Sequence, residues 1–119
     1  MTFKRFDVVR VHYPFTDQKT SKLRPALVLS NDDFNRVAKH SVFAMITSSK
    51  RDKWPGDCDI VDLNGAGLSK PSLVRMKIFT LDHRFVEDKI GHFAGDDNDS
   101  VWRSLSTTFL SKADGETGL

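Results

Sequence analysis

The sequence has little of what disulfide-rich, zinc-binding or membrane-spanning proteins require. It contains one cysteine, Cys58, in 119 residues, so neither an internal disulfide nor a cysteine-based zinc site can form. No apolar run approaches the roughly 18 residues that a membrane helix needs. The segment from Met1 to Asp7 lacks the apolar stretch and cleavage site of a signal peptide. We therefore expect a small cytoplasmic protein with no membrane partner.

Recognisable metal and cofactor motifs are also missing. The histidines are scattered along the chain at His12, His40, His83 and His92, without the spacings that place two histidines on one helix face. The glycine patterns of phosphate-binding and dinucleotide-binding loops do not occur. We therefore expect no bound metal and no cofactor.

The net charge is small, but it is unevenly distributed. Lys and Arg number 18 and Asp and Glu 16, so the formal net charge is +2. Residues 1–60 hold 11 basic and 7 acidic side chains, whereas residues 61–119 hold 7 basic and 9 acidic ones. The first half therefore favours a basic face, although ordinary scatter of charges gives the same counts.

Alternating apolar and polar residues predict a mainly β domain over residues 1–110. Asp7 to Tyr13 alternates in the manner of a half-buried strand, and the apolar run that begins at Pro25 is typical of a central one. The same reasoning predicts strands at 25–29, 42–47, 58–63, 71–79 and 85–93.

Two helical segments are expected. The polar residues 30–33 resemble a helix cap and precede a helical turn at 34–37. After Gly95, a cluster of acids precedes Val101, Leu105 and Phe109, whose four-residue spacing predicts an amphipathic C-terminal helix. Five to seven short antiparallel strands close most economically into a small β-barrel, against which this helix packs. Residues 111–119 are expected to form a C-terminal tail.

Polar and cationic side chains gather near the ends of these strands. Arg24 directly precedes the apolar strand at 25–29, and Thr47 and Ser48 end the strand at 42–47. Either hydroxyl also has a plain role in capping the strand and its turn. An arginine beside hydroxyls suits a phosphodiester, because the guanidinium binds phosphate oxygens in pairs and stays charged.

Two further pairs of cations extend this set. Lys19 and Lys22 lie in the basic loop 15–23 that leads to Arg24, and Arg75 and Lys77 share one face of the fifth strand. A solvated strand face is the simpler explanation of the second pair. If the strands are neighbours, these side chains converge on one patch. An RNA backbone brings its own nucleophile, the 2′-hydroxyl, so such a patch need only position and neutralise it.

Other residues have competing interpretations. Arg24 also fits a surface ion pair with Asp17 or Asp32. Trp54 either anchors its loop by packing or stacks on a base. Cys58 fits a small structural residue better than a nucleophile, since no histidine lies near it in the sequence. A purely structural role for the cations would place Arg24 and Arg75 on opposite faces.

Several strings resemble, in order and rough spacing, the MazF/PemK toxins of bacterial toxin–antitoxin systems. The resemblance runs from about Lys4 to Leu110 and is carried mainly by RPALVLS at residues 24–30, ITS at 46–48 and PSLVR at 71–75. It implies an SH3-like or plasmid-toxin antiparallel β-barrel that forms a homodimer. It also implies metal-independent, sequence-specific cleavage of single-stranded RNA, leaving 2′,3′-cyclic phosphate and 5′-hydroxyl ends, and a cognate antitoxin that blocks the RNA groove.

The resemblance also implies roles for individual residues. Arg24 and Thr47 match catalytic positions, and Ser48 and Arg75 match substrate-contact positions, the second being catalytic in some members. Loop 15–23 matches a mobile loop that touches RNA, which adds Lys19, Ser21 and Lys22 to the expected RNA-binding residues. Lys77 is also expected to bind RNA, because it shares a strand face with Arg75.

The chain departs from the family pattern at three places. Phe6-Asp7 stands where many members have Gly-Asp, so a turn that tolerates a positive φ is expected to be lost or replaced. Lys77 and Ile78 stand where many members have an acid and a glutamine, which makes the expected site more cationic.

The third departure lies in the first loop, where some members have a histidine or serine. Together with the replacement of the acid by Lys77, it leaves the general base open. Gln18 and Ser21 are the nearest loop candidates, and His12 and His83 are candidates only if the fold brings them close. The replacements at Lys77 and Ile78 also keep an alternative function open. In that alternative, the chain is a catalytically degenerate barrel that binds nucleic acid or a partner without nuclease activity.

Overall fold

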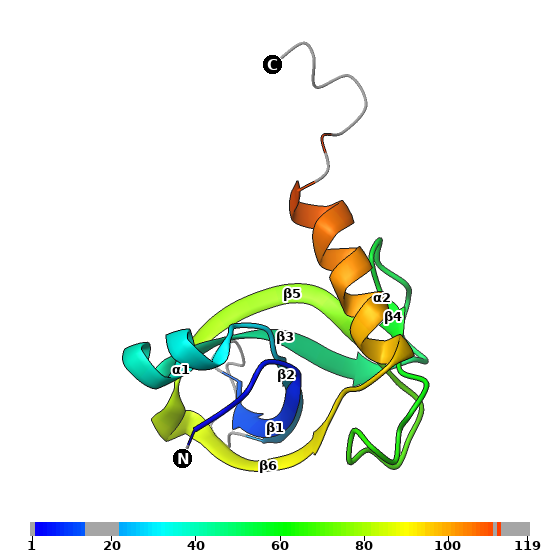
Figure 1. Ribbon diagram of the computed structural model, residues 1–119. Coiled ribbons are helices and arrows are strands. Elements are labelled where there is room, and N and C mark those ends of the chain that lie inside the picture. Colours follow the sequence, from blue (N-terminus) through cyan, green and yellow to red (C-terminus); the bar gives the residue numbers. More distant parts are fainter. Residues whose placement is uncertain (1, 14–21, 111, 113–119) are drawn as a thin grey trace.

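One six-stranded antiparallel sheet forms the framework of the computed structural model, which describes residues 2–13, 22–110 and 112 (Figure 1). The strands follow the order β4-β5-β3-β2-β1-β6 across the sheet. Their bounds are β1 (Asp7–His12), β2 (Leu23–Val28), β3 (His40–Ser48), β4 (Cys58–Asp59), β5 (Ser72–Asp82) and β6 (Val86–His92). The predicted mainly β class is confirmed.

Two helices flank this curled sheet on different sides (Figure 1). Helix α1 (Asp32–Ala38) connects β2 to β3, and helix α2 (Asp96–Leu105) follows β6 and ends in a π-helical turn, Ser106–Leu110. The predicted C-terminal helix is therefore confirmed, and nearly all of the expected tail lies outside the described residues. Within the described ranges, no helix is long and apolar enough to cross a membrane.

Strand alternation builds a core on each face of the sheet. The α2-facing core gathers Val8, Leu27, Ala44, Val74 and Val101 among others. The far-face core gathers side chains at alternate positions of the same strands, together with Phe3; its members include Val9, Val11, Ala26, Phe43 and Phe79. Both sets are buried, so the chain is held by two layers of apolar packing around one sheet.

β5 carries a bulge beside the region where the site residues lie. The consecutive residues Ala44 and Met45 of β3 pair with Ile78 and Arg75, so β5 has two extra residues between those partners. An insertion of two residues preserves the alternation of faces, and therefore the predicted face pattern of this strand survives. It also bends the strand, as bulges do.

The strand predicted at 58–63 begins at Cys58 as expected but is shorter, because the paired strand ends at Asp59. The carboxylate of Asp97 at the start of α2 accepts hydrogen bonds from the amides of Val61 at 2.8 Å and Asp62 at 3.0 Å. These donors are therefore satisfied by a side chain rather than by a neighbouring strand.

The turn before β1 keeps a positive φ without glycine. Phe6 has φ 71°, its amide donates to the Val28 carbonyl at 2.7 Å, and its carbonyl accepts from the Phe93 amide at 2.9 Å. Its ring is buried and meets Trp102 edge-on at 5.5 Å. The turn expected to be lost or replaced is thus retained, because aromatic packing and two hydrogen bonds hold a strained residue in place.

A glycine at the end of α1 is expected to stabilise the protein. Lys39 caps the helix with φ 55°, a conformation that costs an L-residue energy but that glycine adopts freely, and its side chain is exposed. We expect Lys39→Gly to raise the free energy of unfolding by about 0.5–1 kcal/mol, measured by urea denaturation. Lys39→Ala is the control, since it removes the side chain but keeps the strained Cβ. An equal gain in both variants would contradict this explanation.

Candidate nucleic-acid interface

The strand register places three of the expected site residues on one face of the sheet. Ala26 of β2 pairs with Met45 of β3, and Met45 in turn pairs with Arg75 of β5. Opposed residues of antiparallel strands share a face, as do residues two apart in one strand. Arg24 and Thr47 therefore lie on the same face as Arg75. The observation that would have supported a purely structural interpretation, Arg24 and Arg75 on opposite faces, is therefore not made.

These residues line a groove of about 540 Å³. Five cationic side chains contribute to the groove and no carboxylate is among its described lining residues; the cations are Arg24, Arg51, Lys70, Arg75 and Lys77. Hydroxyl groups lie between them, from Thr47, Ser48 and Ser72. A concave surface of guanidinium, ammonium and hydroxyl groups attracts polyanions and offers phosphate oxygens several donors.

Arg24 is half-buried and is not tied to a carboxylate of the described residues. The alternative ion pair with Asp32 does not form, because Asp32 instead accepts a hydrogen bond from the Arg5 amide at 3.2 Å. The other candidate partner, Asp17, lies outside the described residues. The Arg24 guanidinium can therefore offer its paired donors to a phosphate in the groove.

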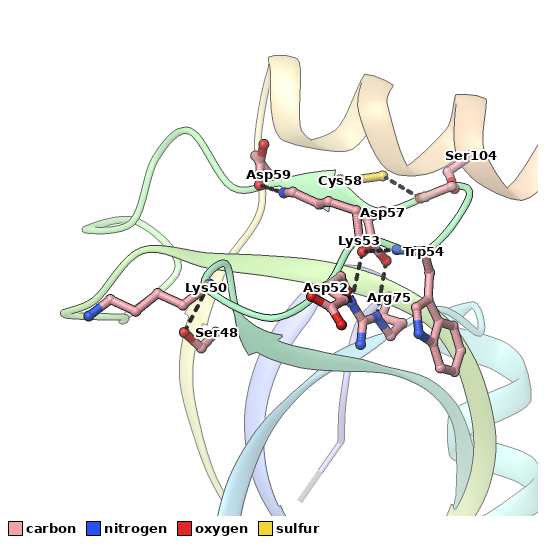
Figure 2. Close-up of polar contacts among 11 residues, drawn as sticks. Ser48, Lys50, Asp52, Lys53, Trp54, Asp57, Cys58, Asp59, Arg75 and Ser104 are labelled. Atoms are coloured by element: carbon pink, nitrogen blue, oxygen red, sulfur yellow. Dashed lines mark hydrogen bonds and ion pairs between the residues drawn. The ribbon is translucent and has the colours of Figure 1, made fainter.

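Arg75 is held by the loop that follows β3 (Figure 2). Its Nη2 donates to Asp57 Oδ2 at 2.9 Å and to the Asp52 carbonyl at 2.6 Å, and its Nε donates to Asp57 Oδ1 at 3.2 Å. The side chain of Arg75 is 7% exposed and that of Asp57 is 3% exposed. Burial opposes ionisation of Asp57, but the hydrogen bonds from Arg75 and from the Trp54 amide outweigh it and lower the carboxyl pKa.

The same ion pair positions Trp54. The Trp54 amide donates to Asp57 Oδ2 at 2.8 Å, and the Arg75 guanidinium carbon lies 4.6 Å from the centre of the indole ring. The ring lines the groove and remains 45% exposed. Loop packing therefore accounts for one face of this side chain and leaves much of its surface in the groove.

The family of the chain follows from comparison with known proteins. Residues 4–109 match the family model described as the PemK-like, MazF-like toxin of type II toxin–antitoxin systems. The chain belongs to this family. Among curated proteins, no sequence match to the chain was found.

Solved structures of MazF toxins share the fold of this toxin. An endoribonuclease in complex with its cognate antitoxin, from a mycobacterial species, is 18% identical, with TM-score 0.73 and coverage of 92% of this chain and 97% of that chain. MazF in a MazE–MazF structure from Deinococcus radiodurans is 22% identical, with TM-score 0.73 and coverage of 94% and 100%. Mycobacterium tuberculosis toxin MazF-mt6 is 16% identical, with TM-score 0.72 and coverage of 90% and 99%.

The groove of this toxin brings together five of the eight expected site residues. Four of them, Arg24, Thr47, Ser48 and Arg75, match family motifs, and the fifth, Lys77, is exposed at the β5 bulge. Lys22 is exposed just before β2 and is not among the described lining residues. The remaining two, Lys19 and Ser21, lie outside the described residues.

Two cations of the groove, Arg51 and Lys70, were missed by the sequence reasoning. Both lie just beyond one end of the β3–β5 pair, Arg51 after β3 and Lys70 before β5. At that end, Ser48 pairs with Ser72 and the Ser49 amide donates to the Pro71 carbonyl at 3.2 Å. Residues just after β3 and just before β5 therefore meet. The pairing of β3 with β5 is the signal that would have found them.

The described candidates for a general base, His12 and His83, are not among the residues that line the groove. His12 Nε2 is 3.8 Å from Glu87 Oε2, and His83 Nε2 is 2.7 Å from the buried Ser41 hydroxyl. Cys58 is half-buried, and burial raises the pKa of its thiol, as its structural interpretation requires. In the described part of the chain, no three His, Cys, Asp or Glu side chains gather in a way that could hold a metal ion.

His83 makes the stability of the toxin depend on pH. Burial lowers the pKa of His83 from its ordinary value of 6.5, so the unfolded chain binds this proton more readily than the folded one. We therefore expect stability to fall as the pH drops below about 6.5 towards the folded pKa. Denaturation at pH 7.5 and pH 5.5 should show a smaller loss in His83→Gln than in the wild type, whereas His12→Gln should keep the wild-type loss. An unchanged loss in His83→Gln would contradict this assignment.

Proposed function

We propose that this toxin is a metal-independent, sequence-specific endoribonuclease that cleaves single-stranded RNA in the groove. One observation carries the proposal: Arg24 and Thr47 lie on the same face of the sheet, in a groove to which Arg24 and four other cations contribute. The solved MazF structures described as endoribonucleases support it through their common fold. The products are a 2′,3′-cyclic phosphate on one fragment and a 5′-hydroxyl on the other.

The reaction uses a nucleophile that the substrate carries. The 2′-hydroxyl attacks the adjacent phosphorus and loses its proton, while the bond from phosphorus to the 5′ oxygen breaks and that oxygen gains a proton. Negative charge builds on the non-bridging oxygens, where the Arg24 guanidinium stabilises it through paired hydrogen bonds. Thr47 orients the scissile phosphate through its hydroxyl.

Neighbouring phosphates of the strand need cations along the groove. Lys77, Arg51 and Lys70 provide them on the β3–β5 side, and Ser48 donates a hydrogen bond at the end of β3. Lys19, Ser21 and Lys22 of the basic loop 15–23 are the further RNA contacts that we propose. Arg75 lines the groove, although Asp57 engages its Nε and Nη2 and offsets much of its positive charge.

The proposal includes two protein partners and a location. The toxin forms a homodimer, and a cognate antitoxin inhibits it by occupying the RNA groove. Complexes with antitoxin among the structures that share the fold support the proposed antitoxin partner. We propose a cytoplasmic location, where an RNA substrate and an antitoxin would both be available.

One feature favours a second candidate function. Lys77 stands at the bulge where many family members have an acid, and Arg75 is tied to Asp57. A barrel of this kind without a base would hold RNA or its antitoxin without cleaving. Product analysis separates the two functions, because a binding protein retards RNA on a gel without shortening it.

The test uses protein purified free of antitoxin, a long mixed-sequence RNA and excess EDTA. The proposal predicts discrete cuts at one short sequence, with cyclic-phosphate and 5′-hydroxyl ends identified by end-specific ligation and sequencing. Intact RNA incubated with a folded protein would overturn the nuclease and leave the binding function. Cleavage that disappears with EDTA would overturn the metal-independent mechanism.

A further inference from the structure

The groove contains an aromatic surface that the proposed cleavage chemistry does not use. Trp54 is 45% exposed there, so much of its surface is available to a ligand in the groove. The other aromatic residue of the described lining, Tyr13, is buried and donates its hydroxyl hydrogen to the Pro25 carbonyl. Trp54 is therefore the aromatic ring in the described lining with substantial exposed surface.

The indole is fixed before any ligand arrives. The Arg75 guanidinium backs the ring at 4.6 Å, and Asp57 binds both that guanidinium and the Trp54 amide (Figure 2). The Asp52 carbonyl holds the guanidinium from the same loop. A ring held in this way loses little conformational entropy when a second flat group stacks on it.

The surroundings of the ring favour a nucleobase as that group. Arg51, Lys70 and Lys77 line the same groove and can bind the phosphates on either side of a base. Aromatic rings placed between cations are the usual means of binding unpaired nucleic acid, because every base has a face to stack. An acidic protein segment also complements these cations, so binding of the antitoxin is one of the outcomes that the test distinguishes.

We propose that Trp54 is the platform on which one unpaired base of the RNA stacks, and that the Asp57–Arg75 pair holds this platform in position. The inference rests on the proposed function and adds a residue that selects the substrate. Asp57 and Arg75 act through Trp54 as positioning residues. Stacking favours single strands over duplexes, in which the bases already stack on one another.

Trp102 is a matched control elsewhere on the molecule. It is 47% exposed, and the Arg5 guanidinium carbon lies 4.9 Å from its ring centre, so its packing closely resembles that of Trp54. It lies on α2 and is not among the described residues of the groove. Trp54→Leu and Trp102→Leu therefore remove the same kind of side chain, backed by the same kind of cation, inside and outside the groove.

The test measures binding of an oligonucleotide that contains the cleaved sequence, with one 2′-deoxynucleotide at the cut to prevent cleavage. We expect Trp54→Leu to weaken binding about 10–100-fold, Trp54→Phe to recover most of the loss, and Trp102→Leu to bind like the wild type. Oligonucleotides with an abasic site at each position in turn identify the stacked base. An abasic site at the stacked position should weaken binding to the wild type. The same abasic site should weaken binding to Trp54→Leu only slightly, because that variant has already lost the stacking contact.

Further readouts separate stacking from structural damage and from other partners. In a Trp102→Phe background, RNA should quench the fluorescence of Trp54, and thermal unfolding of Trp54→Phe should match that of the wild type.

Equal binding and cleavage by Trp54→Leu and Trp102→Leu would overturn the platform while leaving the nuclease standing. A wild type that neither binds nor cuts RNA would overturn both proposals. Loss of antitoxin binding alone would assign Trp54 to a protein interface and also overturn the platform.

Discussion

Arg24→Ala is expected to lower the rate of RNA cleavage about 10²–10³-fold, the effect of losing about 3–4 kcal/mol of transition-state stabilisation. The guanidinium lies in the groove on the same face as Thr47, and no described carboxylate competes for its donors. Since its contribution grows as charge develops on the phosphate, the loss should fall mainly on the single-turnover rate. Single-turnover cleavage of a labelled oligonucleotide measures it.

Arg10 provides the control for this experiment. It lies on β1 next to Val11, the residue that pairs with Arg24, but it points to the opposite face and forms an ion pair with Asp88 at 2.6 Å. Arg10→Ala therefore removes a nearby arginine without touching the groove, and its cleavage rate should stay close to that of the wild type. Arg24→Lys should recover only part of the rate, because an ammonium group lacks the paired donors. Wild-type cleavage by Arg24→Ala would remove Arg24 from the mechanism.

Asp57→Ala is expected to lower the free energy of unfolding by about 2–3 kcal/mol. It leaves the Arg75 guanidinium, 7% exposed, without its charged partner, and it removes the acceptor for the Trp54 amide. Asp59→Ala two residues away is the matched control. Asp59 is 70% exposed and binds Lys53 at the surface, so its loss should change stability by less than about 0.5 kcal/mol. Urea denaturation of the two variants provides the comparison.

The same pair predicts an acid response. The pKa of Asp57 is lowered in the folded protein from 3.8, so the folded state binds this proton less readily than the unfolded chain. Its stabilisation is complete above about pH 4 and is lost as the pH falls through the folded pKa. Asp57→Ala should lack this part of the loss between pH 5 and pH 3. Equal stabilities of Asp57→Ala and Asp59→Ala at neutral pH would contradict the role given to the pair.

Most of the fold was predictable, because local alternation determines which face of each strand is buried. The segments around Val9, Val28 and Phe43 show this, as does the spacing of Val101 and Leu105 in α2. The strand predicted at 58–63 is shorter than expected because a residue far along the chain binds the amides of its second half. Asp97 binds the Val61 amide across 36 positions, and no local pattern contains that contact.

The site was predictable to the extent that motifs carry it. Arg24, Thr47 and Ser48 lie in the groove that the strings RPALVLS and ITS implied. Arg75 was expected to face a phosphate, but Asp57, 18 positions earlier, engages its guanidinium. Arg51 was missed for the same kind of reason, since its place depends on which strands pair. Neither the contact between Asp57 and Arg75 nor the strand pairing that places Arg51 can be inferred from local composition.

Phe6 illustrates a different limit of sequence reasoning. Replacement of a glycine suggested that the turn before β1 had changed, yet φ is 71° at this phenylalanine. Contacts with Trp102 and hydrogen bonds to Val28 and Phe93 offset the local strain. A residue preference is a weak predictor wherever tertiary packing can compensate for it.

The most direct test compares two oligonucleotides that contain the cleaved sequence, one entirely of ribonucleotides and one with a single 2′-deoxynucleotide before the scissile phosphate. With EDTA present, the toxin should cut the first, leaving a cyclic phosphate, and should bind the second with similar affinity without cutting it. Cleavage of both at similar rates would show that the 2′-hydroxyl is not the nucleophile and would contradict the proposed function of the Arg24–Thr47 groove.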